Sequence, residues 1–537
     1  MPNHERLLVS GNEAIALACL HAGVRLGTGY PGTPSTEILE SFSELGGRAQ
    51  WAPNEKVAFE VALGAAFGGA RTLVTMKHVG LNVAADPLFT ATYTGVTGGM
   101  VVVCADDPGM ASSQNEQDNR HYAAAARIPM LEPADSQEAY DFPALAFELS
   151  ERWGIPVLLR PTTRVCHSKT VLVTHAVSSP AHAVHFERNI PARVMVPGYA
   201  RAAHARLLGK IAEFATWSET APVNRILPGD RSLGIVTSGV AFTHAREAAP
   251  TASILKLGMT WPLPEKLLRQ FAASVDRLAV IEEGDPILWT ALRALGIAVD
   301  GKPEAYRLGE LTVDRARRIL AGDASPEPAP LRGSPAELCK GCPHRVSFET
   351  LRDLKCIVTG DIGCYTLGVM APFEAMDTCV CMGASIGVGL GLRHVLPEAE
   401  ARRVVSVIGD STFMHSGLTG LADMVYNPPP TGHIVMILDN STTAMTGLQE
   451  HAGTGRSLNH EPAHRIACED VARAMGVRQI HVIDPLKERD RLVTVLTDAM
   501  QANETTLIVM RRPCLLAASK IREYEQRSAG KPAPAGS

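Results

Sequence analysis

The stretch of residues 404–447 places the narrowest limits on what this chain can fold into. A β-branched run at residues 404–408 ends in Gly-Asp-Ser and is followed by apolar residues at helical spacing. A second apolar run, residues 434–438, ends in Asp-Asn. Two short apolar runs with a helical stretch between them predict a strand–helix–strand unit with a right-handed crossover and parallel strands. The sequence therefore predicts an α/β fold.

Asp410 and Asn440 follow the two predicted strands directly. The carboxyl ends of parallel strands form the edge at which α/β sheets bind ligands. A carboxylate, a side-chain amide and a loop carbonyl are the hard oxygen ligands that Mg²⁺ takes while it keeps phosphate oxygens and water. The sequence contains no GxxxxGK[ST] motif, which disfavours a nucleotide cradled by lysine. These residues predict a diphosphate held through a divalent metal, and the alternative is an ordinary Gly-Asp turn.

Composition excludes several classes of protein. With 46% hydrophobic and 20% charged residues, a net charge of -5 and a pI near 6.4, the chain has no basic footprint for nucleic acid. The N-terminal residues lack a basic region followed by an apolar core, and no apolar run reaches the roughly 18 residues needed to span a bilayer. We therefore expect a soluble, cytoplasmic protein. Its 11 cysteines are expected to be thiols or metal ligands rather than disulfides.

The order of patterns along the chain predicts three α/β domains. Alternating strand and helix patterns weaken after residue 170, recover near residue 226 and recur after a Pro/Gly/Ser-rich linker at residues 322–336. The predicted segments are an N-terminal domain at 1–170, a linker with a helical arm at 171–225, a middle domain at 226–325, a C-terminal domain at 337–515 and a polar tail at 516–537.

Local signals in the N-terminal domain predict individual elements. The turn-rich loop GTGYPGTP leads into a helix starting near Glu37, for which Ser35 or Thr36 is the expected cap. Asn54 is the expected cap of a helix at residues 55–69. Buried strands are expected at residues 71–76, 99–104 and 155–159.

Motifs spread over nearly the whole chain resemble one enzyme family. They read GYPGTPSTEI, NEQDNRHYA, CKGCPHR, TGDIGCYTLG, MGASIGVGLG and IGDSTFMHSGL, the last followed by LDNSTTAMTG. Together they resemble the α subunit of the indolepyruvate:ferredoxin oxidoreductases, in the 2-oxoacid:ferredoxin oxidoreductase superfamily. The resemblance implies a thiamine-diphosphate-binding fold with an N-terminal pyrimidine domain, a smaller middle domain and a C-terminal diphosphate domain.

The resemblance also implies how the diphosphate is held. Asp410 and Asn440 would bind Mg²⁺ through their side chains, and Thr442 through its backbone carbonyl. Met382 would support the cofactor, although a methionine is more often a plain core residue. Other residues expected to bind the cofactor are Gly383, Ala384, Ser385, Gly409, Ser411, Thr446 and Gly447.

Glu55 matches the family's activating glutamate, which hydrogen-bonds the aminopyrimidine of thiamine. A carboxylate near an Ala/Gly-rich, low-dielectric interface suits general acid–base work, because burial raises its pKa. The alternative is a first-turn acid that is favoured by the helix dipole. Glu60 is the competing candidate and lies deeper in the same predicted helix.

The cysteine pattern leaves several chemistries open. Cys339 and Cys342 form a C-x₂-C without a second C-x₂-C, so a zinc ribbon is poorly supported. A redox dithiol and plain buried thiols remain alternatives. The resemblance implies that these two cysteines, together with Cys364 and Cys514, bind a [4Fe–4S] cluster.

Two residues are expected at the substrate end of the site. Thr33 matches a family threonine near the 2-oxoacid carboxylate, and Arg120 is the candidate for a bidentate pair with that carboxylate. Lys77 and His78 are weaker candidates for a polar partner. As structural alternatives, Thr33 caps a helix and Arg120 bridges the acids Glu116 and Asp118.

The activity implied by the resemblance is thiamine-dependent oxidative decarboxylation of indolepyruvate-type 2-oxoacids, with coenzyme A as cosubstrate. Family α subunits commonly end in a ferredoxin-like segment with two CxxCxxCxxxCP runs, whereas this sequence has no cysteine after Cys514. Electrons are therefore expected to leave through ferredoxin or another external acceptor. A smaller β subunit and a dimer of heterodimers are expected. A non-oxidative decarboxylase and an inactive scaffold subunit are the alternatives.

Overall fold

The computed structural model describes residues 5–177, 184–327 and 337–529. The chain divides into two compact units, Met1–Ala329 and Pro330–Ser537, which are described separately. Part of the predicted linker, residues 328–336, and the end of the predicted tail, residues 530–537, lie outside the described residues. The division into three domains stays a prediction.

The first unit is built on a seven-stranded sheet in the order β12-β6-β7-β5-β4-β2-β3. Six of its strands are parallel, and β12 pairs antiparallel with β6. The central strands β4 and β5 are buried on both faces, as expected for a parallel sheet covered by helices. The strands are β2 (Leu26–Gly29), β3 (Ala49–Trp51), β4 (Thr72–Lys77), β5 (Met100–Ala105), β6 (Met130–Leu131), β7 (Val157–Leu159) and β12 (Met259–Trp261).

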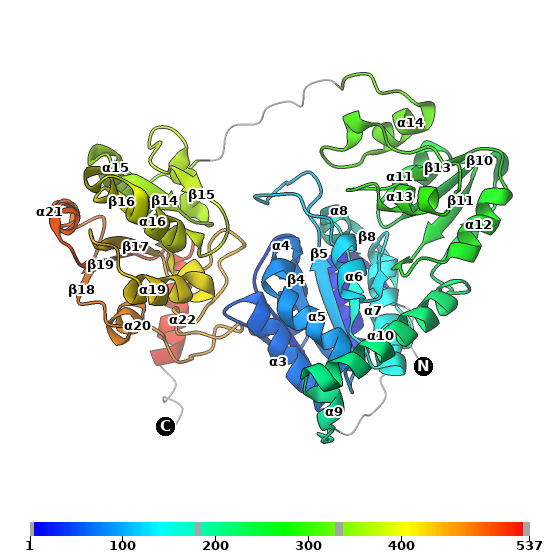
Figure 1. Ribbon diagram of the computed structural model, residues 1–537, viewed down its shortest axis with the longest axis horizontal. Helices are drawn as coiled ribbons and strands as arrows, with labels where there is room; N and C mark the ends of the chain where they lie inside the picture. The colour runs from blue at the N-terminus through cyan, green and yellow to red at the C-terminus, as the bar shows by residue number, and fades with distance from the viewer. Residues whose placement is uncertain (1–4, 178–183, 328–336, 530–537) are drawn as a thin grey trace. The chain divides into compact units, whose positions relative to one another are not determined.

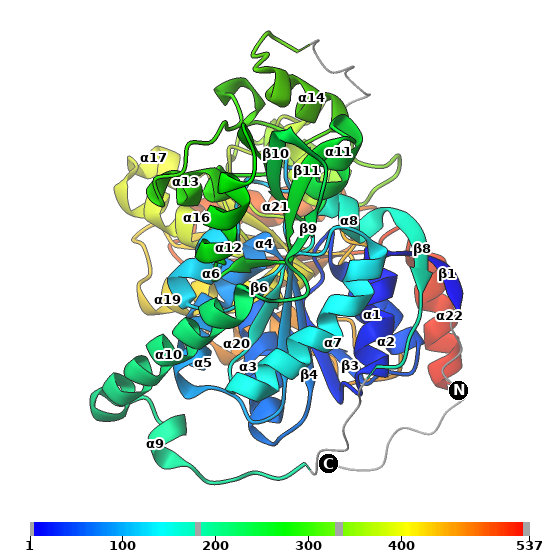
Figure 2. The same cartoon turned by 90° about the vertical axis from the view of Figure 1, so that its right-hand side faces the viewer.

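Helices cover both faces of this sheet (Figures 1 and 2). One face carries α3 (Glu55–Phe67) and α5 (Ala85–Thr94), whose apolar residues pack on those of β4 and β5. On the other face α1 (Gly11–His21) lies against α7 (Ser136–Trp153), as Figure 2 shows. A small antiparallel ribbon of β1 (Arg6–Ser10) and β8 (Lys169–Val173) flanks them.

Two predicted helix starts have different outcomes. Asn54 caps α3 as predicted, because its side-chain oxygen accepts a hydrogen bond of 3.0 Å from the Val57 N–H. The helix α2 (Thr36–Glu44) begins close to the predicted position. Ser35 occupies the cap position, but its hydroxyl donates to the Gly32 carbonyl instead, at 2.8 Å. The prediction of side-chain capping by Ser35 is therefore wrong.

The first unit also contains a four-stranded sheet in the order β13-β10-β11-β9 (Figure 1). Its strands are β9 (Arg225–Leu227), β10 (Asp230–Ser238), β11 (Ala252–Leu257) and β13 (Leu278–Ile281), and its helices are α11 (Ala241–Ala248), α12 (Glu265–Ala273), α13 (Ile287–Ala294) and α14 (Val313–Ala321). Helix α10 (Pro197–Ser218) covers the predicted helical arm and packs along α5. Because β12 continues the seven-stranded sheet, this region is closely joined to the N-terminal one.

A buried ion network fastens the two regions of the first unit together. The Arg120 guanidinium is paired with Asp118, at 2.6 Å, and with Glu282, which follows β13, at 2.8 Å. Its Nη2 also donates to the backbone carbonyls of Glu283 and Asp285, each at 2.8 Å. Charges buried to this degree are tolerated only when they are paired and hydrogen-bonded.

The second unit is an all-parallel six-stranded sheet in the order β15-β14-β16-β17-β19-β18. The predicted strand–helix–strand unit is confirmed, because β16 and β17 are neighbouring parallel strands. Between them the chain forms α18 (Asp410–Thr412), a π-helical turn (Phe413–Gly417) and α19 (Leu418–Tyr426). The strands are β14 (Ile357–Gly360), β15 (Thr378–Cys379), β16 (Val404–Gly409), β17 (His433–Asp439), β18 (Gln479–Ile483) and β19 (Thr505–Arg511).

Apolar clusters cover both faces of the second sheet. One cluster joins the sheet to α15 (His344–Asp353) and α21 (Arg489–Gln501). The other joins it to α16 (Ala384–Val395), α19 and α20 (Cys468–Ala474). The chain then runs into α22 (Ala518–Ala529). None of the described helices combines the length and apolar character that crossing a membrane requires.

The first prediction concerns the buried network. Replacing Arg120 by Met should lower the free energy of unfolding of the first unit by about 3–5 kcal/mol, because it leaves the buried Glu282 without its ion-pair partner and Asp118 with Arg160 alone. Thermal denaturation of the Arg120→Met variant would measure this loss. Arg231→Met is the control, since Arg231 and its partner Asp276 are 72% and 67% exposed and such pairs contribute little. Equal melting temperatures for both variants would contradict the assignment.

Candidate active site

The parallel register of the second sheet collects polar side chains at one edge. Gly409 is level with Leu438, and Leu438 with Met510, so β16, β17 and β19 end side by side. The residues that follow the strand ends are Asp361 after β14, Asp410 after β16, Asn440 after β17 and Cys514 a few residues after β19. The predicted metal ligands and one predicted cluster ligand therefore lie at the same edge.

Asp410 is buried, and a hydrogen-bond network holds its carboxylate. Its Oδ2 accepts from the Ser441 N–H at 2.9 Å and lies 3.2 Å from Nε2 of His451. Burial raises the pKa of Asp410, but His451, Asp439 and the Ser411 backbone together outweigh it and leave the pKa below its usual value. Asp410 thus stays ionised, which a metal ligand requires. Sequence reasoning missed His451.

Asn440 and Thr442 form the second half of the predicted metal site. The side-chain oxygen of Asn440 accepts from the Thr442 N–H at 3.2 Å, and its Nδ2 lies 3.4 Å from Nε2 of His344. Burial lowers the pKa of His344 to about 4, although the nearby Asp410 opposes this shift, so the imidazole is neutral. The bond from the Thr442 N–H closes a tight turn directly after Asn440.

The donor set fits a magnesium ion in its chemistry. One carboxylate, one amide oxygen and one backbone carbonyl leave the remaining octahedral positions to phosphate oxygens and water. Asp439 lies close to Asp410, and burial together with that neighbouring charge raises the pKa of Asp439. The Asp439 carboxylate is itself paired with the Arg511 guanidinium, at 2.7 Å. No group of three or more His, Cys, Asp or Glu side chains among the described residues is arranged to hold a metal ion by itself.

The loop after Asn440 contains the other residues predicted to lie against the diphosphate. The Ser411 hydroxyl is 2.7 Å from that of Thr443, which ties the start of α18 to this loop. The Thr446 hydroxyl donates to Gln449 at 2.6 Å, and Gly447 has a φ of 125° that disfavours any other residue. These contacts fix the loop beside Asp410.

The residues from Met382 to Ser385 are held by an acid that sequence reasoning did not name. Asp361 accepts hydrogen bonds from the N–H groups of Gly383, at 2.9 Å, and Ser385, at 3.0 Å. The N–H of Ala384 is bonded to the Cys381 carbonyl, and Met382 is half-buried. The N-terminus of α16 is thus already capped by a carboxylate. The strand-end rule that identifies Asp410 would also have identified Asp361.

The four predicted cluster cysteines line one cavity of about 90 Å³. Cys339 and Cys342 come from the turn before α15, Cys364 starts the 3₁₀ helix Cys364–Val369, and Cys514 follows β19. Burial raises the pKa of the Cys364 thiol to about 11, and the three other thiols contribute to this increase. Four thiols from three separate segments fit a [4Fe–4S] cluster, whose irons spread their ligands more widely than a single ion does.

This cavity adjoins the predicted metal site. His344 and Asn440 also line it, and the Cys514 N–H donates to the Asn440 carbonyl at 2.9 Å. A residue predicted to bind the metal and a residue predicted to bind the cluster are therefore hydrogen-bonded to each other. Cys379 and Cys381 are not among the residues that line this cavity.

In the first unit, Glu55 is buried at the start of α3. A side chain on Gly80 would place its Cβ 2.6 Å from the Glu55 carboxylate, so the glycine makes the room that the carboxylate occupies. The competitor Glu60 lies on the exposed side of the helix and pairs with Lys56. Of the two acids, Glu55 alone has the burial that the predicted activating role requires.

Lys77 packs on the loop that contains Thr33. Lys77 ends β4, and a Cβ on Gly32 would lie 3.1 Å from its side-chain stem, so the two segments are in contact. Thr33 is half-buried in the same turn. The turn follows β2, so these residues share the carboxyl edge of the seven-stranded sheet.

Arg120 does not have the surroundings expected of a substrate-binding residue. Its guanidinium donates to Asp118, Glu282 and two backbone carbonyls. These partners engage all three nitrogens of the guanidinium. The alternative of a structural bridge is met by Asp118, and not by Glu116. The predicted pairing with a substrate carboxylate has no support in these contacts.

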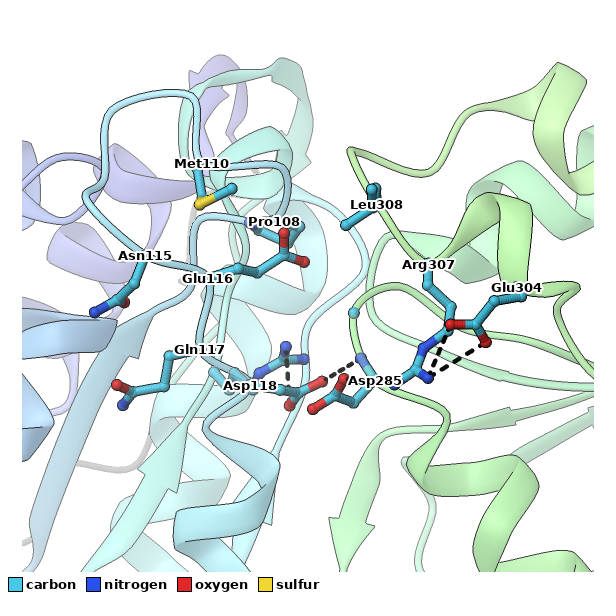
Figure 3. Close-up of a pocket in the computed structure, with 12 residues that line it drawn as sticks. Pro108, Met110, Asn115, Glu116, Gln117, Asp118, Asp285, Glu304, Arg307 and Leu308 are labelled. Carbon is cyan, nitrogen blue, oxygen red and sulfur yellow. Dashed lines mark hydrogen bonds and ion pairs between the residues drawn. The ribbon is translucent and has the colours of Figure 1, made fainter. Parts of the chain in front are cut away.

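A cavity of about 680 Å³ lies between the two regions of the first unit (Figure 3). Asp118 and Asp285 lie at its base, joined by a hydrogen bond of 3.0 Å from the Asp285 N–H. Met110 and Leu308 lie on its two sides. Its remaining lining residues are Pro108, Asn115, Glu116, Gln117, Arg160, Gly284, Glu304 and Arg307. The loop of the NEQDNR motif therefore forms one wall of this cavity.

Two family models match the chain. Residues 17–193 match "Pyruvate flavodoxin/ferredoxin oxidoreductase, thiamine diP-bdg". Residues 361–510 match "Thiamine pyrophosphate enzyme, C-terminal TPP binding domain". The region that carries Glu55 and the region that carries Asp410 each match a model of thiamine diphosphate binding.

Known proteins are similar along nearly the whole chain. "Indolepyruvate oxidoreductase subunit IorA" of Archaeoglobus fulgidus is 38% identical over 97% of this chain and 88% of its own. The protein of the same name from Methanothermobacter thermautotrophicus is 40% identical over 96% of this chain and 88% of its own. Among solved structures, a 2-oxoglutarate:ferredoxin oxidoreductase from Magnetococcus marinus aligns with a TM-score of 0.48 and 16% identity over 60% of this chain and 65% of that chain.

The second prediction concerns the strand end at Gly409. A Cβ at this position would lie 2.6 Å from the buried ring of Tyr365, so Gly409→Ala should destabilise the second unit by about 1–3 kcal/mol. Gly391→Ala is the control, because nothing lies within 4 Å of the added carbon in α16 and alanine favours a helix by up to ~1 kcal/mol. Urea denaturation compares the two variants. A Gly409→Ala variant as stable as Gly391→Ala would contradict this packing.

Proposed function

Because the chain belongs to the family of indolepyruvate oxidoreductase IorA subunits, we propose that it decarboxylates indolepyruvate-type 2-oxoacids oxidatively. It is a subunit of a thiamine-diphosphate-dependent 2-oxoacid oxidoreductase, with the corresponding α/β fold. Beyond this family-level function, the proposal specifies an aryl substrate, an acyl-coenzyme A product and electron transfer through a [4Fe–4S] cluster. The observation that carries it is the cavity shared by four cysteines and Asn440.

We propose roles in cofactor binding for each unit separately. In the second unit, Asp410, Asn440 and the Thr442 carbonyl would hold Mg²⁺ and through it the diphosphate. Gly409, Ser411, Thr446 and Gly447 lie in the same region of this unit. In the first unit, Glu55 would accept a hydrogen bond from the aminopyrimidine of thiamine. Met382, Gly383, Ala384 and Ser385 act through the shape of the turn, since Asp361 and Cys381 engage the N–H groups of the last three.

The protein's part in the reaction is to hold charges and protons in place. When bound, thiamine diphosphate supplies the nucleophilic carbon and the electron sink for decarboxylation. The Glu55 carboxylate holds the proton that the aminopyrimidine shares, and its burial keeps water from competing for that bond. Thr33 and Lys77 form the polar wall beside it, at the end where a 2-oxoacid would react.

The cysteine cavity is the proposed outlet for electrons. Cys339, Cys342, Cys364 and Cys514 would hold a [4Fe–4S] cluster, which would supply one-electron steps. Cys514 is one hydrogen bond away from Asn440, which supports a short path between the two cofactors. We further propose that a smaller β subunit, an acceptor such as ferredoxin and coenzyme A complete the reaction in a cytoplasmic dimer of heterodimers.

The proposal predicts the composition of the intact protein. Purified without oxygen together with its β subunit, it should contain iron, sulfide and thiamine diphosphate, and reduce a one-electron dye with an aryl 2-oxoacid and coenzyme A. Metal, sulfide and thiamine analyses measure this. Thiamine without iron, together with release of an aldehyde, would instead identify a non-oxidative decarboxylase. A protein with neither cofactor would be a scaffold.

Two variants separate the two cofactors. Asp410→Ala should lose thiamine diphosphate while it keeps its fold and iron, because it removes the ionised metal ligand. Cys364→Ser should lose iron while it keeps thiamine. The matched controls are Asp423→Ala on α19 and Cys381→Ser, both exposed positions. Full thiamine content in Asp410→Ala would contradict the proposed metal site. Full iron content in Cys364→Ser would contradict the proposed cluster site.

A further inference from the structure

A 2-oxoacid carries a carboxylate, and the proposed site needs a cation to receive it. The sequence favours Arg120 for this task, but Asp118, Glu282 and two backbone carbonyls engage its guanidinium. A substrate carboxylate would have to displace buried carboxylates from this arginine. A cation without a carboxylate partner would receive the substrate without this displacement.

Lys77 is a cation at the same sheet edge without a carboxylate partner among the described residues. Its Nζ forms a single hydrogen bond there, to the Ser112 carbonyl at 3.2 Å. An ammonium group has three donors, so two N–H directions are left for a ligand. Burial lowers the pKa of Lys77, and the charges of Asp107 and Glu55 partly oppose this shift. A half-buried ammonium with one neutral partner gains by pairing with an anion.

The position of Lys77 suits a substrate more than a structural ion pair. Its stem packs on Gly32, next to Thr33, in the loop after β2. The Glu55 carboxylate is near enough to raise the pKa of Lys77. The stem of Lys77 thus packs on the residue that precedes the predicted substrate threonine.

The neighbouring residue His78 fixes the surroundings of Lys77. Its Nε2 lies 3.1 Å from the Asn115 carbonyl, which requires the proton on that nitrogen. Its own carbonyl accepts from the side chains of Gln117, at 3.0 Å, and Asn119, at 3.4 Å. Lys77 and His78 together therefore hold the loop from Ser112 to Asn119 over the end of β4.

We propose that Lys77, rather than Arg120, pairs with the carboxylate of the 2-oxoacid substrate. The inference rests on the proposed function and names the residue that orients its substrate. Lysine offers a point charge on a flexible stem, which accepts a carboxylate without the fixed two-point geometry of arginine. Arg120 acts instead as the positioning residue that holds the NEQDNR loop, through Asp118 and the end of β13.

The test compares a carboxylate ligand with a neutral one. Intact complexes with the Lys77→Met, Lys77→Arg and Lys210→Met substitutions are titrated by calorimetry with a 3-arylpropionate and with its amide, neither of which can react. Lys210→Met is the matched control, because Lys210 is also a half-buried lysine bonded to one carbonyl, that of Gly154 at 2.9 Å. Steady-state kinetics with the 2-oxoacid accompany each titration.

Lys77→Met should weaken binding of the carboxylate ligand by about tenfold or more, the loss of one charge-assisted pair of ~1.4 kcal/mol. Binding of the amide should be unchanged. KM for the 2-oxoacid should rise more than kcat falls. Lys77→Arg should recover most of the affinity, and Lys210→Met should behave as the wild-type protein.

Several results would overturn the assignment. Carboxylate binding in Lys77→Met as tight as in the wild-type protein would do so, as would equal losses for the carboxylate and the amide. If Lys77→Met does not fold, Lys77→Gln takes its place under the same criteria. A wild-type complex that lacks thiamine and turns over no 2-oxoacid contradicts the proposed function itself. If Lys77→Met turns over the 2-oxoacid and prefers the carboxylate ligand over its amide as strongly as the wild-type protein does, only the role of this lysine is contradicted.

Discussion

The parallel register of the six-stranded sheet is the constraint on which the second unit depends. Because β16, β17 and β19 are paired in step, Gly409, Leu438 and Met510 lie level, and the residues that follow them meet at one edge. Buried apolar strands fix this register, since helices cover both faces of the sheet. The edge then brings the carboxylate of Asp410 and the amide of Asn440 together.

A second constraint, the buried ion network, decides which cations remain available in the first unit. Arg120 joins Asp118 to Glu282, and Glu282 is 162 residues from Arg120 in sequence. Such a network is costly to leave incomplete, so its members are not free to change partners during a reaction. Arg120 therefore holds two regions of the unit together, whereas Lys77 has N–H groups that can donate to a ligand.

The cysteine cavity relates the proposed cofactor site to the proposed electron outlet. Cys514 is bonded through its N–H to the carbonyl of Asn440, and His344 contacts both the cavity and the Asn440 side chain. Burial keeps His344 neutral, so it adds no charge between the two sites. The sheet edge that carries the predicted metal ligands therefore also carries Cys514, one of the predicted cluster ligands.

The sequence by itself determined the features that depend on local patterns. Alternation of apolar runs predicts the strands, and strand-end chemistry predicts Asp410 and Asn440, because both signals are contained in a few neighbouring residues. Tertiary structure alone decided which groups those residues meet. Asp361 caps α16 and Arg120 reaches Glu282 across the fold, and neither contact follows from sequence spacing. Local chemistry fixes what a residue can do, whereas long-range packing fixes which partner it finds.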